Sequence, residues 1–352
     1  MSTLLHRPGA VDGTGLDAGV AAHYGDPHRE QRLLEEGLAV VDLSHRGVVT
    51  ITGPDRLSWL HSLTTQHLTG LTPRTSAETL ILSPKGHIEH ALHVVDDGGT
   101  TWLTTEPGEA TAVAGWLDSM RFMLRVEVAD VTERYAVLGE PIGTESAEGE
   151  PLAWVDPWPR TVGDTHAYGP EDEAHPGQDR RWRELIVPRS DLEATVGARP
   201  LAGTWAAEAL RVAAWRPRGG VDTDHRSIPH ELDWLRTAVH LEKGCYRGQE
   251  TVARVRNLGR PPRRVVFLHL DGSGHVSPEP GTELVPADGG RPVGTLKSVA
   301  RHHEDGPIAL ALVKYTTDPS AVLLADEVAA AQTTIVPVST ERPTQRPRIP
   351  RA

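Results

Sequence analysis

The spacing of hydrophobic and polar residues predicts a mixed α+β fold in the N-terminal part of the chain. Leucines at near-helical spacing predict helices within residues 30–37 and 53–68, with Pro54 just inside the second, and an apolar stripe predicts a third helix over 109–120. Strands are expected at 46–53, 77–83, 87–95, 100–105, 124–132 and 134–139. Because strands and helices are interleaved, this order is typical of a split βαβ arrangement.

The pattern breaks over residues 139–180, which are rich in Gly, Pro, Asp and Glu and have little apolar periodicity. This stretch is interpreted as a long surface insertion or mobile loop, in which "LAWVDPW" is the part able to pack. Regular structure resumes with a strand at 181–188 and helices at 191–197 and 203–215. The first 22 residues are Gly-rich and are expected to be loose, so residues 23–258 form the predicted α+β region.

Residues 259–338 have a different, β-rich pattern. Strands are expected at 263–270, 292–300 and 308–315, and turn clusters such as "PADGG" and "EDGP" separate them. Short strands at this spacing indicate a small barrel or sandwich. The Pro/Arg-rich tail, residues 339–352, is expected to be disordered.

The amino-acid composition limits the compartments and partners that are expected for the protein. Of 352 residues, 38% are hydrophobic and 24% are charged, which is ordinary for a globular protein. One cysteine allows no intramolecular disulfide and fits a reducing compartment. Neither a signal peptide nor an apolar run of about 18 residues is recognised, so a cytoplasmic location without a membrane partner is expected. The net charge of −12 argues against nucleic acid as a partner.

The single cysteine lies in the stretch "KGCYRGQE", where Lys243 and Arg247 each stand two residues from Cys245. Nearby cations stabilise a thiolate, the reactive form of cysteine. Glycines permit a positive φ and a close approach to another backbone, which is expected here for both glycines of the stretch. Its other members are Gly244, Tyr246, Gly248, Gln249 and Glu250. From these residues alone, Cys245 is either a working thiol or a small buried hydrophobe.

Two further charged stretches have alternative interpretations. Between Lys243 and Arg264 there are seven cations and one acid, Glu250, which indicates either a site for a carboxylate or phosphate ligand or a solvated face. "RHHED", residues 301–305, has two adjacent histidines without the usual metal-ligand spacing and is interpreted as a surface loop. No metal site is predicted, and one cysteine cannot by itself hold an iron–sulfur cluster.

Residues 243–250 resemble the K-G-C-[YF]-x-G-Q-E signature of the YgfZ family, folate-binding proteins that help to maintain iron–sulfur enzymes. Residues 39–68, 80–94 and 206–215 resemble the wider superfamily that contains the aminomethyltransferase of the glycine cleavage system. The resemblance implies an α+β fold of this superfamily. Its three parts form a cloverleaf around a central cavity: a ferredoxin-like part, a related second α+β part and a C-terminal β-barrel.

By the same resemblance, tetrahydrofolate or a one-carbon derivative binds in the central cavity. Cys245 is implied near the rim of this cavity, activated by Lys243 and Arg247, with Arg254 holding the glutamate tail of the folate. The implied partners are folate and iron–sulfur assembly or client proteins, together with transient contact to a cluster. Enzymatic activity is left open, and a folate-dependent transferase-like reaction is one option.

Two positions depart from the aminomethyltransferase pattern. Glu89 and His90 replace a pair of acids, and Ala213 replaces a folate-binding glutamate. Glu231 and Asp222 are candidate substitutes for the missing carboxylate. Three hypotheses follow: a folate-dependent accessory protein for iron–sulfur cluster assembly or repair, a glycine-cleavage aminomethyltransferase, and a non-enzymatic module with a vestigial cavity.

Overall fold

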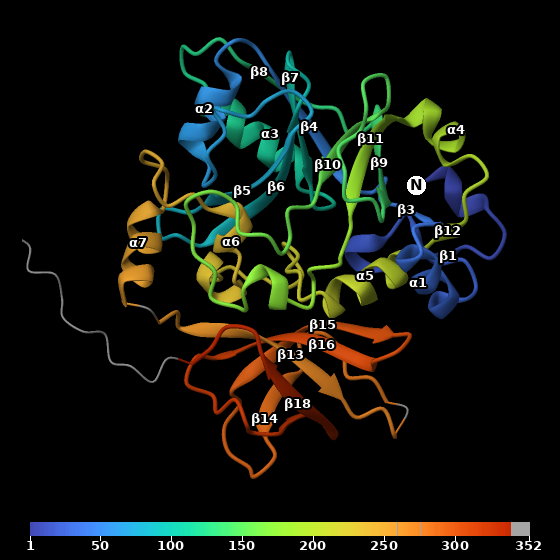
Figure 1. The fold of residues 1–352 in the computed structure, drawn as a ribbon, viewed down its shortest axis with the longest axis vertical. Helices are drawn as coiled ribbons and strands as arrows, with labels where there is room; N and C mark the ends of the chain where they lie inside the picture. The colour runs from blue at the N-terminus through green and yellow to red at the C-terminus, as the bar shows by residue number, and fades with distance from the viewer. Residues whose placement is uncertain (259, 275, 339–352) are drawn as a thin grey trace, which may run out of the picture.

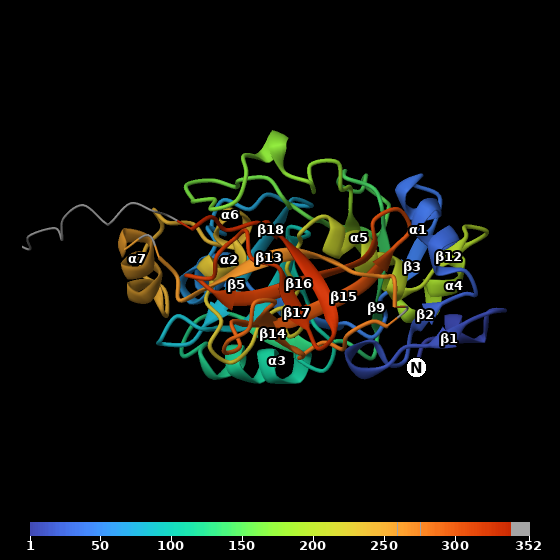
Figure 2. The ribbon, with the colours of Figure 1, turned by 90° about the horizontal axis from the view of Figure 1, so that it is seen from below.

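Two α+β parts lie side by side above a β-barrel in the computed structural model of the chain (Figure 1). The structure describes residues 1–258, 260–274 and 276–338. The three-part architecture predicted for the chain is therefore confirmed. Viewed from the barrel side, α7 (Gln249–Leu258) lies at one end of the molecule, and α1 (Pro27–Glu35) and α4 (Leu192–Val196) lie at the other (Figure 2).

The first part is a five-stranded antiparallel sheet in the order β5–β6–β7–β4–β8. Its strands are β4 (Gly47–Thr52), β5 (Ser76–Leu82), β6 (Ile88–Asp96), β7 (Thr100–Thr105) and β8 (Glu127–Asp130). Helices α2 (Arg56–Leu63) and α3 (Ala110–Ser119) pack on it through Leu60, Val113 and Leu117, which are fully buried. Since α2 begins at Arg56, Pro54 lies before the helix and not inside it.

The second part is a mixed sheet in the order β10–β11–β9–β3–β12, in which only β12 and β3 pair in parallel. Its strands are β3 (Val40–Asp42), β9 (Tyr135–Glu140), β10 (Leu152–Val155), β11 (Arg183–Pro188) and β12 (Leu201–Ala202). The accompanying helices are α1 (Pro27–Glu35), η4 (Arg189–Asp191), α4 (Leu192–Val196) and α5 (Thr204–Ala213). The sheets meet where Trp154 of β10 donates its indole N–H to the carbonyl of Ala77 on β5.

The third part is a closed barrel in the order β13–β16–β15–β14–β17–β18. Its strands are β13 (Arg263–Leu270), β14 (Glu283–Pro286), β15 (Gly294–His302), β16 (Gly306–Lys314), β17 (Leu323–Ala325) and β18 (Val328–Thr334). Alternate residues of β13 face opposite sides: Val266 and Leu268 belong to the barrel core, and Val265 and Phe267 to the core beneath the α+β parts. The predicted tail, residues 339–352, lies outside the described residues.

Two segments expected to be loose are ordered. The N-terminal residues form η1 (Thr3–His6), β1 (Val11–Asp12), η2 (Gly15–Asp17) and β2 (Ala21–His23), and Leu4 and Val20 are fully buried. Within 139–180, strand β10 and the short helix η3 (Asp172–Ala174) form, and Trp154 and Trp158 are buried. Both tryptophans belong to "LAWVDPW", the part of the segment that was expected to be able to pack.

The cysteine stretch follows η5 (Pro229–Leu232) and α6 (Leu235–Ala238) and runs into α7 (Gln249–Leu258). Tyr246 and Val252 join one hydrophobic core with Leu82 of the first sheet and Phe267 of the barrel. The motif is therefore anchored where the first sheet and the barrel meet. In the described part of the chain, no helix is both long and apolar enough to cross a membrane.

Candidate functional site

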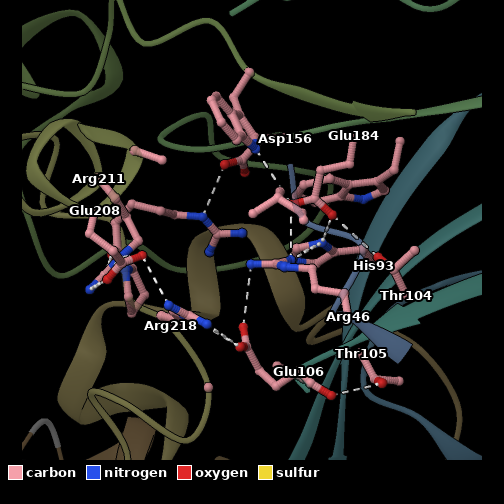
Figure 3. Close-up of a pocket in the computed structure, with 18 of the residues that line it drawn as sticks. Arg46, His93, Thr104, Thr105, Glu106, Asp156, Glu184, Glu208, Arg211 and Arg218 are labelled. Atoms are coloured by element: carbon pink, nitrogen blue, oxygen red, sulfur yellow. Dashed lines mark hydrogen bonds and ion pairs between the residues drawn. The ribbon is translucent and has the colours of Figure 1, made fainter. Parts of the chain in front are cut away.

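A central cavity lies between the two sheets, helix α5 and the loop before residue 220 (Figure 3). Its lining includes five arginines and five carboxylates, which makes it highly charged but balanced. These residues are Asp17, Arg46, Glu106, Asp156, Arg180, Glu184, Glu208, Arg211, Arg216 and Arg218. Such a cavity suits a polar ligand that offers both hydrogen-bond donors and acceptors.

On one wall, Glu184 of β11 accepts hydrogen bonds from Arg46 at 2.9 Å and His93 at 2.9 Å, and from Thr104 at 3.3 Å. The imidazole of His93 stacks on the indole of Trp154, with ring centroids 3.6 Å apart. Burial alone would raise the pKa of Glu184, but the Arg46 guanidinium and the His93 imidazole hold that pKa well below its ordinary value. Glu184 is therefore ionised and orients this wall.

On the opposite wall, Arg218 bridges three carboxylates that come from separate parts of the chain. Its guanidinium lies 2.8 Å from Asp17, 2.9 Å from Glu106 and 3.2 Å from Glu208. Burial would lower the pKa of Arg218, but these charges raise it well above its ordinary value. Arg211 in turn holds Glu208 at 2.8 Å and the buried Asp222 at 2.7 Å.

Three buried nitrogen donors of the cavity lining have no hydrogen-bond partner among the residues that the structure describes. They are Arg46 Nε, Arg216 Nη1 and Trp234 Nε1. An unpaired buried donor costs about 1–3 kcal/mol, so such groups point to an acceptor supplied from outside the protein. Among the carboxylates, Glu106 has spare accepting capacity, because its Oε1 has one long contact, 3.5 Å from Arg46.

None of these charged cavity residues was predicted from the sequence. They are dispersed from Asp17 to Arg218, and none belongs to the cysteine motif. The one local signal was the unusual "RPRGG" stretch, in which both arginines prove to be buried, at 4% and 7% exposure. Charged residues are rarely buried unless paired, but which ones will be paired is visible only after folding.

Cys245 is a free, exposed thiol in the irregular segment between α6 and α7. The flanking Tyr246 is 7% exposed and packs in the shared core. Gly248 has a φ of +84°, and a side chain there would lie 2.7 Å from the carbonyl oxygen of Ser83 and 3.0 Å from the Cα of Gly86. The motif therefore rests directly on the β5–β6 turn, with the thiol left accessible.

Lys243 is buried, and its ammonium group donates to the carbonyl oxygens of His61, Thr64 and Gln66. These three bonds use all the donors of a lysine. Burial lowers its pKa to about 7, while the carbonyl partners favour the charged form. In this structure, Lys243 fixes the end of α2 to the motif and donates no hydrogen bond to the thiol.

Arg247 and the residues of β6 form a second contact between the motif and the first sheet. Arg247 pairs with Glu89 at 3.0 Å, and its guanidinium carbon lies 5.6 Å from the ring centroid of Trp116. His90 Nδ1 lies 2.9 Å from Glu109. Neither Glu89 nor His90 lines the central cavity, whereas Ala91 and His93 of the same strand do.

The remaining predicted site residues are also placed outside the cavity lining. Arg254, on α7, and Glu250 are exposed, and Gln249 is half-buried at the start of α7. Glu231 is fully buried and accepts two hydrogen bonds from Arg263, at 2.9 and 2.8 Å. Its carboxylate is thereby committed to the barrel.

Gly244 and Ala213 differ from what the sequence suggested. The expectation of a positive φ is wrong for Gly244, which is absent from the positive-φ glycines and has open space around its Cα. Ala213, at the end of α5, lines a neighbouring cavity and not the central one. Asp222 does not line the central cavity either, but supports its wall through Arg211.

Known proteins share this architecture. Residues 19–140 match the model of the GCVT N-terminal domain. The solved structure of the glycine cleavage system aminomethyltransferase T from Bartonella henselae superposes with a TM-score of 0.74 at 17% identity, covering 96% of this chain and 97% of that one. The protein therefore has the aminomethyltransferase fold.

Among relatives by sequence, a chloroplastic protein of Arabidopsis thaliana named as a transferase is 26% identical over 305 residues. The match covers 80% of this chain and 66% of that protein, just under two thirds of its length. The aminomethyltransferase of Parasynechococcus marenigrum is 26% identical over 274 residues, covering 69% of this chain and 71% of the relative. These similarities relate the chain to aminomethyltransferase-like proteins.

Proposed function

We propose that the protein binds a tetrahydrofolate in its central cavity. The observation that carries the proposal is the set of unpaired donors on residues that line this cavity, Arg46 Nε, Arg216 Nη1 and Trp234 Nε1. A folate offers acceptors on its pterin ring and on its glutamate carboxylates, so its chemistry complements these donors.

Glu106 is the residue proposed to bind the pterin ring in place of the folate-binding glutamate that Ala213 replaces. Its Oε1 lies on the cavity wall with only the long 3.5 Å contact to Arg46. It can accept hydrogen bonds from the pterin N–H groups, while the flat pair of His93 and Trp154 offers an aromatic surface. A bound tetrahydrofolate would supply one-carbon carrier chemistry. The positions of Glu231 and Arg254 outside the lining give no support to direct contact with a ligand there.

Binding can be measured by anaerobic calorimetric titration with tetrahydrofolate, and by the fluorescence of Trp154 and Trp234. Glu106→Gln is expected to weaken binding about ten-fold or more, because it replaces a charge-assisted hydrogen bond. Glu250→Gln, on exposed α7, is the matched control and should bind as wild type. Absence of binding by the wild-type chain would contradict the proposal and favour a vestigial cavity.

We further propose that the protein supports iron–sulfur cluster assembly or repair through the thiol of Cys245. The eight-residue motif carries this part of the proposal, together with an arrangement that buries Lys243 and Tyr246 while exposing the thiol. Since none of residues 243–250 lines the central cavity, the placement favours contact with a partner's cluster or thiol over reaction with a cavity-bound folate. The folate site and the thiol then act at separate places.

Complementation of a strain lacking the native gene tests this role. Cys245→Ser is expected to restore little of the iron–sulfur enzyme activities, whereas Arg254→Ala, an exposed change on the adjacent helix, should restore them. Both variants are expected to fold, since both side chains are exposed. Full recovery with Cys245→Ser would exclude a role for the thiol.

A second candidate, glycine-cleavage aminomethyltransferase activity, is favoured by the similarity to proteins of that name. It requires a carboxylate at the hairpin that carries Glu89 and His90, but neither residue lines the cavity. Glu89 is also paired with Arg247. An assay of methylene transfer from a lipoyl carrier to tetrahydrofolate is therefore expected to show no turnover, and measurable turnover would favour this candidate.

A further inference from the structure

A cluster of two histidines and a glutamate lies away from the central cavity, where α1 meets the turn between β15 and β16. Glu35 ends α1, His302 ends β15, and His303 follows it. One ligand atom from each of the three residues lies within 4.8 Å of the other two. In sequence Glu35 stands far from the "RHHED" stretch, so only the fold completes this group.

The two imidazoles lie near different oxygens of the same carboxylate. His303 Nε2 lies 2.6 Å from Glu35 Oε2, and His302 Nε2 lies 4.0 Å from Glu35 Oε1. The two rings are adjacent, with centroids 4.7 Å apart and planes tilted by 42°. A simple ion pair needs one imidazole, whereas two imidazoles converging on one carboxylate provide three potential metal ligands.

The backbone that carries the histidines is fixed to the helix that carries the glutamate. Gln31, which is 1% exposed, accepts a hydrogen bond from the His303 N–H at 2.9 Å and donates one to the Arg301 carbonyl at 2.9 Å. Gln31 and Glu35 are four residues apart and thus share a helix face. The positions of the three side chains are therefore set by buried structure, although Glu35 itself is 44% exposed and can adjust.

His302 is also held from behind. Its Nδ1 accepts hydrogen bonds from the backbone N–H groups of Asp305 at 3.2 Å and Glu304 at 3.4 Å, and lies 3.4 Å from the Asp305 carboxylate. These contacts orient the ring and leave Nε2 on the side of Glu35.

We propose that Glu35, His302 and His303 bind a divalent transition-metal ion of the zinc class. Imidazole nitrogens with one carboxylate oxygen suit this class, and three protein ligands leave a coordination position open. Glu35 and His302 also line a cavity of about 590 Å³, which shares Arg180 with the lining of the central cavity. The cavity beside these two residues is large enough for a small ligand.

Titration of the untagged full-length chain with Zn²⁺ by calorimetry, and with Co²⁺ by visible absorption, tests the site. One bound equivalent is expected, with Co²⁺ showing the absorption bands of a site containing imidazole. His303→Ala and the conservative Glu35→Gln should each weaken binding about ten-fold or more. His269→Ala removes an exposed barrel histidine and should change nothing.

Cys245→Ser tests whether the thiol contributes to metal binding. This variant is expected to bind one equivalent of metal, as the wild-type protein does. No binding by wild type, unchanged affinity in both His303→Ala and Glu35→Gln, or loss of binding in Cys245→Ser would overturn the proposal. Folate binding by Glu35→Gln should remain that of wild type, so the outcome is independent of the proposed function. Circular dichroism of each variant distinguishes a lost ligand from a lost fold.

Discussion

At the residue scale, the central cavity depends on pairing every lining arginine with a carboxylate. The pairs are Arg46–Glu184, Arg180–Asp156, Arg211–Glu208, Arg216–Asp156 and Arg218–Glu106. A buried ion pair is weak evidence for added stability, but removing one partner leaves an uncompensated charge. The pairs hold a polar cavity open inside the molecule, and that cavity is where a ligand is proposed to bind.

Glu184 gives a pH prediction for this network. Its pKa in the folded protein is held below the ordinary value of 4.5, so its stabilising contribution is present above that value and is lost as the pH falls below it. The difference in unfolding free energy between wild type and Glu184→Gln should therefore shrink between about pH 5 and about pH 3, by at most about 1.4 kcal/mol per pH unit. Urea denaturation across this range measures it, and a constant difference would contradict the pairing.

At the element scale, the cysteine motif is positioned by its contact with the β5–β6 turn. Gly86 and Gly248 pack closely, since an added Cβ on Gly248 would lie 3.0 Å from the Cα of Gly86, and one on Gly86 would lie 2.7 Å from the Thr251 side chain. Both residues have positive φ values, +77° and +84°. The close approach of turn and helix therefore requires glycine for two reasons, space and backbone conformation.

Gly248→Ala is expected to lower the unfolding free energy by about 3 kcal/mol, because it adds both backbone strain and a clash with Ser83. Gly244→Ala is the matched control in the same motif. A side chain at Gly244 meets no atom within 4 Å, so its effect should stay within about 0.5 kcal/mol. Equal effects of the two substitutions in urea denaturation would disprove the docking of the motif on the turn.

At the scale of the whole molecule, the barrel is joined to the α+β parts through buried polar contacts as well as the shared core. Arg263 of β13 binds Asp224 and the fully buried Glu231. On the other side, Arg211 of α5 donates to Ser298 of β15 at 2.6 Å. These contacts fix the barrel, which lies beneath the two sheets in Figure 1.

Arg263→Met should destabilise the protein by about 3–5 kcal/mol, since it leaves Glu231 buried without a cation. Limited proteolysis is expected to release the barrel region faster than in wild type. Arg291→Met, on an exposed barrel loop, serves as the control and should behave as wild type. If Arg263→Met melts as the wild-type protein does, the barrel is held by apolar packing alone.

Much of the fold could be predicted because its signals are local. The strand predicted at 100–105 and the barrel strand at 263–270 coincide with β7 and β13, since their apolar residues are concentrated in short runs. Strands β10 and β12 were missed because they are short and take their stability from neighbouring strands. Helix α7 was missed because charges interrupt its apolar spacing, and Val252 finds its partners only in the shared core.

The sequence by itself determined the α+β parts, the β-rich C-terminal region and the cysteine motif, because periodicity and a contiguous signature are properties of neighbouring residues. The tertiary structure decided which partners the charged residues have. Lys243 donates hydrogen bonds to three carbonyl groups, Glu231 pairs with Arg263, and Glu106 and Arg216 line the same cavity. Several of the buried partners are distant in the sequence, as Arg46 and Glu184 or Arg218 and Glu106 are, and only folding brings such residues within hydrogen-bonding distance.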